Sequence, residues 1–223
     1  MPTRLQLARR ATPPPPLLRG WLHLICFFLS VPAAVILLTG ATTTRGRVGV
    51  LVYAIGLVAL FGVSGTYHRG HWSASGRAKM KRLDHATIFV MIAGSYTPLC
   101  LLALGGAAGT WLLVAVWAGA ATGLVLVATR VAERPAVGLT SYFALGWVAA
   151  IAMPELARRL PTTEFVLLIV GGLVYTLGGV VLASRWPDPI PRIFGYHEVW
   201  HVMVVGAAIC HFVVIMNVVR ASG

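Results

Sequence analysis

The chain alternates between long apolar stretches and short polar connections, and this alternation predicts its fold. A helix needs roughly twenty apolar residues to cross a hydrocarbon core of about 30 Å. The proline-rich run 186–191 cannot be helical and separates the last two apolar stretches. We therefore expect an all-α, polytopic membrane protein, a bundle of seven transmembrane helices within residues 21–219. The seven stretches lie near 21–40, 48–68, 84–104, 109–129, 137–153, 165–183 and 197–219, and the fifth is the shortest.

The composition agrees with a membrane protein. Hydrophobic residues make up 58% of the 223 positions and charged residues 11%, whereas a soluble domain has about 25% charged residues. A net charge of +12 would indicate nucleic acid binding in a soluble chain. Here the basic residues cluster between the apolar stretches, where membrane topology and lipid headgroups explain them. We expect membrane lipids as partners and no nucleic acid, and the sequence indicates no soluble protein partner.

The distribution of positive charge predicts how the bundle is oriented. Residues 1–20 are basic and proline-rich, and the apolar stretch that follows them is too long for a signal peptide. We expect a retained, disordered cytoplasmic tail. With the N-terminus inside, thirteen Lys and Arg residues lie on the inner side and five on the outer side. The positive-inside rule therefore predicts a cytoplasmic N-terminus and an external C-terminus.

Four polar side chains lie at the ends of three apolar stretches. His68 closes the second stretch, Asp84 opens the third, and His197 and His201 open the seventh. Ionisable groups at such positions are costly in a membrane and often functional. The predicted topology brings all four to the same depth, just within the inner leaflet. This agreement favours one shared site over independent roles.

The residue types at this depth are those of a catalytic zinc site. Because His197 and His201 are four residues apart, they share one face of a helix. Together with His68 they offer three nitrogen ligands and leave a fourth position open, as catalytic zinc sites do. Ser64 lies one turn before His68 and could donate a hydrogen bond to a substrate oxygen. Asp84 could hold a water on the Zn²⁺ or act as general base.

Each of these residues also has an ordinary structural explanation. Histidines at a helix start can reach to the membrane interface, and a carboxylate there interacts favourably with the helix dipole. The segment 197–201 also matches the H-E-x-x-H pattern of zinc proteases, with Glu198 as base. Its third ligand would have to be His211, about 15 Å further along the helix, so we interpret Glu198 as an interfacial carboxylate. Packing or solvent contact is the expected role of His23, His71, His85 and His211.

Four motifs together resemble a known family. They are Ser64-Gly-Thr-Tyr-His68, Leu83-Asp84-His85, Gly94-Ser95-Tyr96-Thr97-Pro98 and His197-Glu198-Val199-Trp200-His201. In this order they resemble bacterial hemolysin III proteins, which are similar to the progestin and adipoQ receptors and, more distantly, to alkaline ceramidases. The resemblance covers nearly all of the chain after the first twenty or so residues. It implies a multi-pass protein of the bacterial inner membrane, with zinc held by the three histidines near the cytoplasmic face.

Three functions remain open from the sequence. The ceramidase-like relatives imply a zinc-dependent hydrolase of lipid amide or ester bonds, involved in membrane homeostasis, with Asp84 as base and Ser64 steadying the oxyanion. A non-enzymatic sensor or receptor would use the same zinc to join the second, third and seventh helices. The hemolysin name implies a pore-forming or cytolytic protein, although no amphipathic stretch suited to inserting into a foreign membrane is present.

Overall fold

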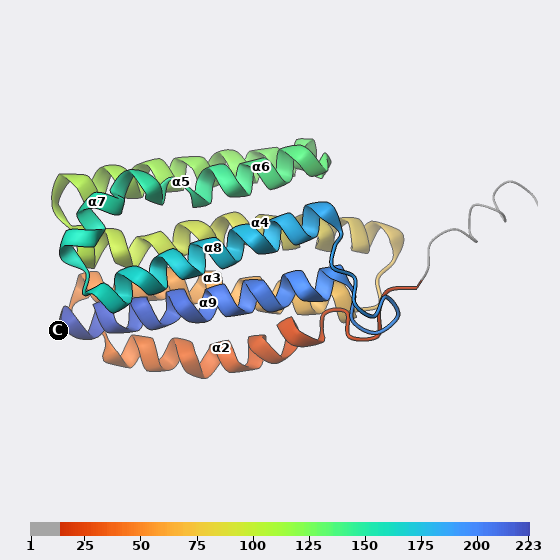
Figure 1. The fold of residues 1–223 in the computed structure, drawn as a ribbon, viewed down its shortest axis with the longest axis horizontal. Coiled ribbons are helices and arrows are strands. Elements are labelled where there is room, and N and C mark those ends of the chain that lie inside the picture. Colours follow the sequence, from red (N-terminus) through yellow and green to blue (C-terminus); the bar gives the residue numbers. More distant parts are fainter. Residues whose placement is uncertain (1–13) are drawn as a thin grey trace, which may run out of the picture.

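The computed structural model describes residues 14–223, and their regular structure is helical (Figure 1). Seven segments among these residues are long and apolar enough to cross a membrane, which confirms the expected number of spans. Their helices are α2 (Trp21–Gly40), α3 (Thr44–Arg69), α4 (Ala74–Pro98), α5 (Gly106–Ala128), α6 (Pro135–Gly146) with α7 (Ala149–Arg159), α8 (Thr162–Ser184) and α9 (Tyr196–Ala221).

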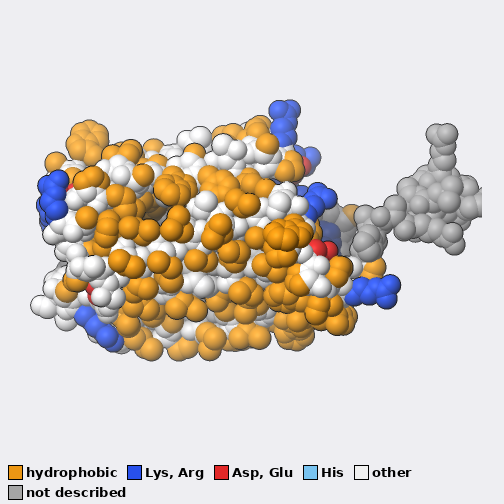
Figure 2. Space-filling model, in the orientation of Figure 1, with side chains coloured by type: hydrophobic (Ala, Val, Ile, Leu, Met, Phe, Trp, Pro, Cys, Tyr) orange, Lys and Arg blue, Asp and Glu red, His pale blue; other side chains and the backbone are white. Residues whose placement is uncertain are grey.

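The helices form a bundle in which most of them pack against their neighbours in the chain. The last helix, α9, packs mainly against α8 and also against α2, while α3 packs between α2 and α4 (Figure 1). Apolar side chains cover the middle of the face seen in Figure 2, and Lys and Arg side chains gather at its two ends. Such a surface matches a hydrocarbon layer bounded by two polar interfaces. The end of the bundle where α2 and α9 begin and α3 ends is called the site end below.

Helix α4 begins nearly three turns earlier in the chain than hydropathy alone predicts, at Ala74 rather than at Asp84. The side chain of Ser73 accepts a hydrogen bond of 3.1 Å from Gly76 N and caps this start. Residues 74–82 lie in the basic connection that the sequence predicted between the second and third apolar stretches. That prediction is wrong for these residues, because they are helical. Asp84 lies inside α4, so the helix-dipole explanation for this carboxylate is also wrong.

The fifth span is broken into two helices. Backbone groups freed between α6 and α7 are costly in a membrane unless they find partners. The hydroxyl of Tyr96 on α4 is a partner for two of these groups. It donates a hydrogen bond to Gly146 O and accepts one of 2.8 Å from Ala149 N. The break is thus held by a neighbouring helix. A short π-helix (Leu99–Leu104) extends α4, and a 3₁₀ turn (Val131–Glu133) follows α5.

The expected cytoplasmic tail falls partly outside the described residues. Residues 1–13 are not described. Residues 14–20 lie against the loop before α9, where Leu17 N and Leu18 N donate to the carbonyls of Arg192 and Ile193 at 3.0 and 3.1 Å. Residues 16–19 of this stretch are called the strap below.

Candidate metal centre

Three histidines from two helices meet at the site end. His68 comes from the last turn of α3, and His197 and His201 come from the first two turns of α9. One ligand atom from each can be chosen so that all three lie within 4.8 Å of one another. The sequence predicted that these three histidines lie together. His197 and His201 share one face of α9 by their spacing, and His68 lies at the end of α3 that meets the start of α9.

The geometry of the three histidines fits a zinc ion. A tetrahedral zinc with Zn–N bonds of about 2.0–2.1 Å separates two ligand nitrogens by about 3.3–3.4 Å. The Nε2 atoms of His68 and His197 are 3.3 Å apart. His201 is 1% exposed, and its Nε2 atom has no hydrogen-bond partner among the described residues. A buried unpartnered nitrogen is destabilising, and a metal ion bound by the group would satisfy it.

A fourth histidine stands directly behind the group. His23, in the first turn of α2, stacks on His201 with ring centroids 3.8 Å apart and ring planes within 6°. It is 2% exposed, and neither of its ring nitrogens has a partner in the described part of the chain. The sequence predicted packing or solvent contact for His23. Its ring does pack, but the prediction did not place it against a candidate metal ligand. The signal was available, because α2 begins at the same predicted depth as α9.

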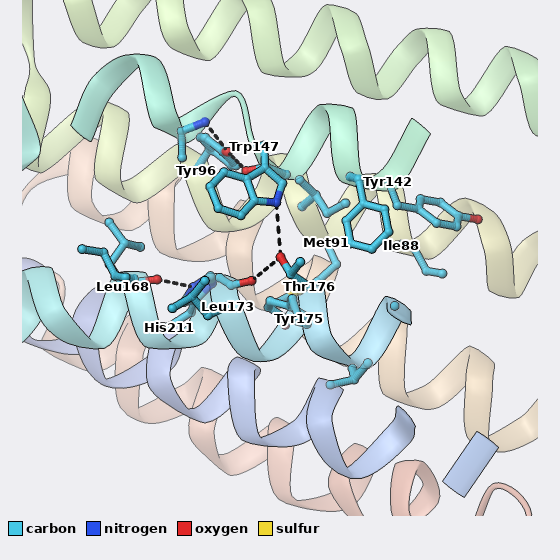
Figure 3. Close-up of a pocket in the computed structure, with 18 of the residues that line it drawn as sticks. Ile88, Met91, Tyr96, Tyr142, Trp147, Leu168, Leu173, Tyr175, Thr176 and His211 are labelled. Atoms are coloured by element: carbon cyan, nitrogen blue, oxygen red, sulfur yellow. Dashed lines mark hydrogen bonds between the residues drawn. The ribbon is translucent and has the colours of Figure 1, made fainter. Parts of the chain in front are cut away.

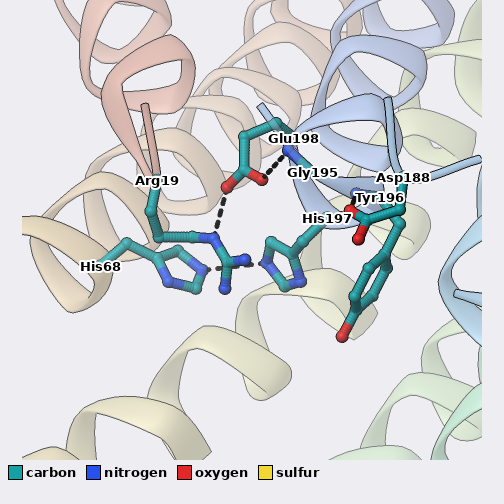
Figure 4. Close-up of polar contacts among 7 residues, drawn as sticks. All are labelled: Arg19, His68, Asp188, Gly195, Tyr196, His197 and Glu198. Atoms are coloured by element: carbon teal, nitrogen blue, oxygen red, sulfur yellow. Dashed lines mark hydrogen bonds and ion pairs between the residues drawn. The ribbon is translucent and has the colours of Figure 1, made fainter. Parts of the chain in front are cut away.

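The carboxylate next to the first α9 histidine is not interfacial. Glu198 is 3% exposed and accepts a hydrogen bond of 2.9 Å from Gly195 N. Its other oxygen is paired with Arg19 of the strap (Figure 4). The expected interfacial position of Glu198 is therefore wrong, because an arginine distant in sequence neutralises the carboxylate and makes its burial possible.

Asp84 and Ser64 lie together one layer deeper in the bundle. Both are buried, at 8% and 3% exposure, and both line the same cavity. Asp84 is not among the groups whose ligand atoms converge within 4.8 Å. The structure thus separates a three-histidine group from a neighbouring carboxylate–hydroxyl pair, and the catalytic roles of the pair stay a prediction.

An internal cavity of about 430 Å³ is lined by Ser64 and Asp84, and it approaches the histidine group through His23 and Trp200, which contact His201. Its polar end is formed by His23, Ser64 and Asp84, and Trp200, which packs on His197 and His201, borders it. Away from this end the wall is mostly apolar and aromatic, as Figure 3 shows for the stretch between Tyr142 and Leu168. The cavity therefore joins a polar head region to a long apolar space.

Two other histidines have roles outside the group. His211 packs edge-on against Tyr175, with ring centroids 5.5 Å apart, and its Nε2 atom is 3.4 Å from Leu168 O (Figure 3). The prediction that it is too far to share an ion with His201 agrees with its absence from the metal-binding group among the described residues. His85 is partly buried, and its carbonyl oxygen accepts a hydrogen bond from the Tyr142 hydroxyl at 3.2 Å.

Comparisons with known proteins agree with the fold. A family model described as haemolysin-III related matches residues 12–212. The chain is 30% identical over 197 residues to Hemolysin-3 of Bacillus cereus, covering 85% of each protein. It is 30% identical over 193 residues to the Hemolysin-3 homolog of Bacillus subtilis, covering 85% of this chain and 87% of the relative. It is also 29% identical over 175 residues to the Monocyte to macrophage differentiation factor of Homo sapiens, covering 77% and 70%.

Proposed function

We propose that this chain, which belongs to the haemolysin-III-related family, is a zinc-dependent hydrolase of lipid amide or ester bonds that serves membrane homeostasis. The chain is a multi-pass cell membrane protein. The observation that carries the proposal is the proximity of three features: a group of three histidines, a buried carboxylate and hydroxyl, and an apolar cavity lined by Asp84, Ser64, and the rings of His23 and Trp200 that contact His201. A lipid has a polar linkage joined to a long apolar chain, which matches this arrangement.

The histidines would hold zinc as neutral ligands. Bound zinc supplies Lewis acidity toward a carbonyl group and toward water. The chain contributes the placement, because His68 and His197 come from different helices and His201 is fixed between His23 and Trp200 by ring contacts. Ligands held on packed helices keep their geometry better than ligands on loops.

Asp84 would act as the general base and Ser64 as its positioning partner. Water that attacks an amide or ester carbonyl must lose a proton, and a carboxylate near the carbonyl can accept it. The Ser64 hydroxyl, which lines the same cavity, would donate its one hydrogen to the Asp84 carboxylate and orient it. When an oxyanion develops, the hydroxyl would turn away from Asp84 and donate to the oxyanion instead. The two residues line the polar end of the cavity, where the linkage of a bound lipid would lie.

The cavity would bind the apolar chain of the lipid and exclude bulk water. Ligand pockets of about 300–1,000 Å³ are typical of small-molecule sites, and most are apolar with a few convergent polar groups. The cavity of about 430 Å³ fits this description. Binding energy from the chain would place the scissile bond near Asp84.

Lipid product analysis with a matched pair of carboxylate variants tests the proposal. Purified protein is incubated with an N-acyl lipid and with an acyl ester, and released fatty acid is measured. We expect Asp84→Asn to retain zinc and lose turnover. The control Glu133→Gln changes an exposed carboxylate in the same way and should leave turnover unchanged. Zinc-loaded protein that releases fatty acid from neither substrate class would contradict a hydrolase, and full turnover in Asp84→Asn would remove the assigned base.

A further inference from the structure

The strap places an arginine directly beside the histidine group. Gly20, the residue after Arg19, packs so closely on α3 that a Cβ atom built on it would lie 2.5 Å from the Cβ of His68. Pro16, at the other end of the strap, approaches Gly195, where an added Cβ would be 3.5 Å from Pro16 Cγ. The strap thus spans from the end of α3 to the start of α9, the two helices that carry the candidate ligands.

Arg19 is fixed there by a buried carboxylate. Its Nε atom pairs with one oxygen of Glu198, and the other oxygen is held by Gly195 N at 2.9 Å. The Glu198 side chain is 4% exposed and that of Arg19 is 20% exposed. The guanidinium is therefore oriented by a partner that is itself immobilised, while part of it remains accessible.

Within residues 14–223, the terminal groups of the guanidinium have no hydrogen-bond partner. Arginine has five N–H donors, and among these residues the only hydrogen bond from the Arg19 side chain is the one from Nε. In the view of Figure 4, the guanidinium is drawn over the gap between the rings of His68 and His197. Because Arg19 precedes Gly20, which packs on His68, and pairs with Glu198, the neighbour of His197, its charge lies next to the residues that carry the candidate ligands.

The charges around the site require an anion once a divalent metal is bound. Zinc and Arg19 would bring three positive charges together, which Glu198, Asp84 and the more exposed Asp188 match in number. Arg77, which lies over the ring of Tyr67, the neighbour of His68, at 5.9 Å, adds a fourth positive charge. In a partly buried site, an uncompensated charge is strongly unfavourable. A bound anionic group would restore the balance.

We propose that Arg19 and the metal together bind an anionic oxygen group, a carboxylate or a phosphate, at the site end of the bundle. The guanidinium fork matches two oxygens of such a group, and charge-assisted hydrogen bonds of this kind are stronger than neutral ones. One oxygen of the anion would face the metal and another the Nη atoms of Arg19. The inference rests on the proposed function, because it needs the same metal, and it assigns to Arg19 the selection of an anionic ligand or product.

Titration of anions into cobalt-substituted protein tests this inference without an activity assay. The visible spectrum of Co²⁺ at the three histidines reports changes around the metal, and the added probes are acetate, inorganic phosphate and oleate. We expect Arg19→Gln to weaken anion binding roughly ten- to hundredfold. Arg19→Lys, which keeps the charge and loses the fork, should fall between. Tighter binding of oleate than acetate would identify a lipid carboxylate as the source, and tighter binding of phosphate than of either would identify a phosphate.

Glu198→Gln separates anion binding from a merely structural ion pair. This variant removes the charge of the partner that orients Arg19 but leaves the positive charge of Arg19, so anion affinity should fall much less than in Arg19→Gln. Equal weakening in Arg19→Gln and Glu198→Gln would overturn the inference, and so would a spectrum that no anion alters in the wild-type protein. Metal analysis of each sample distinguishes the two levels: metal-loaded protein without an anion response contradicts only the role of Arg19, whereas wild-type protein that takes up no metal contradicts the proposed function as well.

Discussion

The helices that carry the candidate chemistry and the helices that enclose the cavity are built differently. In α3 and in α4 with its π-helical extension, 56% and 61% of the most apolar stretch is buried, compared with 11% for the span formed by α6 and α7. The first two helices carry His68, Ser64 and Asp84. The α6–α7 span is a thin, interrupted wall on the lipid-facing side of the cavity, tied to its neighbours by a few side chains such as Tyr96 and Trp147 (Figure 3). The chemistry is thus held by close packing, and the ligand space is bounded by a lightly packed wall.

Glycines show the same difference at the level of single residues. On α3, a Cβ atom at Gly65 would lie 2.9 Å from the Cα of Leu24 on α2. On α8, which lines the cavity, a Cβ atom at Gly172 would meet nothing within 4 Å. A larger side chain at Gly65 should therefore damage the fold, whereas one at Gly172 should only fill space.

The largest expected effect is on turnover, from filling the cavity. Gly172→Trp should lower lipid hydrolysis roughly a hundredfold, because a displaced chain moves the scissile bond away from Asp84. Zinc content should stay unchanged, since Gly172 lies on the cavity side and away from the histidines. Gly172→Ala, a much smaller addition at the same position, should keep most of the turnover. Loss of zinc in Gly172→Trp would show that the two regions are not separable.

A smaller effect is expected on stability, from crowding the site helices. Gly65→Ala should reduce the free energy of unfolding by about 1–3 kcal/mol, because α2 must move away from α3. Since α2 carries His23, which stacks on His201, zinc should also be released more readily to a chelator. Thermal unfolding in detergent measures the first result and the rate of zinc release the second. Gly206→Ala on α9, where a Cβ would meet nothing within 4 Å, is the matched control and should lose no stability.

The smallest effect is expected in the cavity wall. Trp147 Nε1 donates to Thr176 Oγ1 at 3.2 Å and ties the joint between α6 and α7 to α8. Thr176→Val removes the acceptor with little change in shape, and hydrogen bonds between membrane helices contribute on average about 0.6 kcal/mol. The unfolding temperature should fall slightly with zinc content unchanged. Thr122→Val, whose hydroxyl bonds only within its own helix, should have no effect, and a large loss at Thr176 would mean that the wall is a structural core.

The sequence predicts the number of spans and most of their ends, but it misses the start of α4 and the interruption of the fifth span. Hydropathy marks the part of a helix that lies in hydrocarbon, whereas helix formation continues into water wherever capping and helix-forming residues permit it. Residues 74–82 are rich in Lys, Arg and Ala, which favour helices, and Ser73 caps them. The interruption between α6 and α7 depends on Tyr96 of another helix, so no local pattern could reveal it.

The candidate site was predictable where it depends on spacing within a helix and on depth. His197 and His201 share a face by their spacing, and topology brought His68 to the same depth. Contacts between helices were missed. His23 meets His201 only because α2 and α9 pack side by side, and Arg19 and Glu198 are 179 positions apart in sequence. Glu198 appeared interfacial because its neutralising partner could not be identified without the fold.

Metal analysis of the purified protein tests the central claim most directly. Zinc per chain would be measured by elemental analysis for the wild-type protein, for the triple variant His68→Ala, His197→Ala and His201→Ala, and for His71→Ala, an exposed histidine of the α3–α4 connection. We predict about one zinc per chain in the wild-type protein and in His71→Ala, and almost none in the triple variant. A wild-type protein without zinc, or a triple variant that keeps it, would contradict a metal centre at these three histidines.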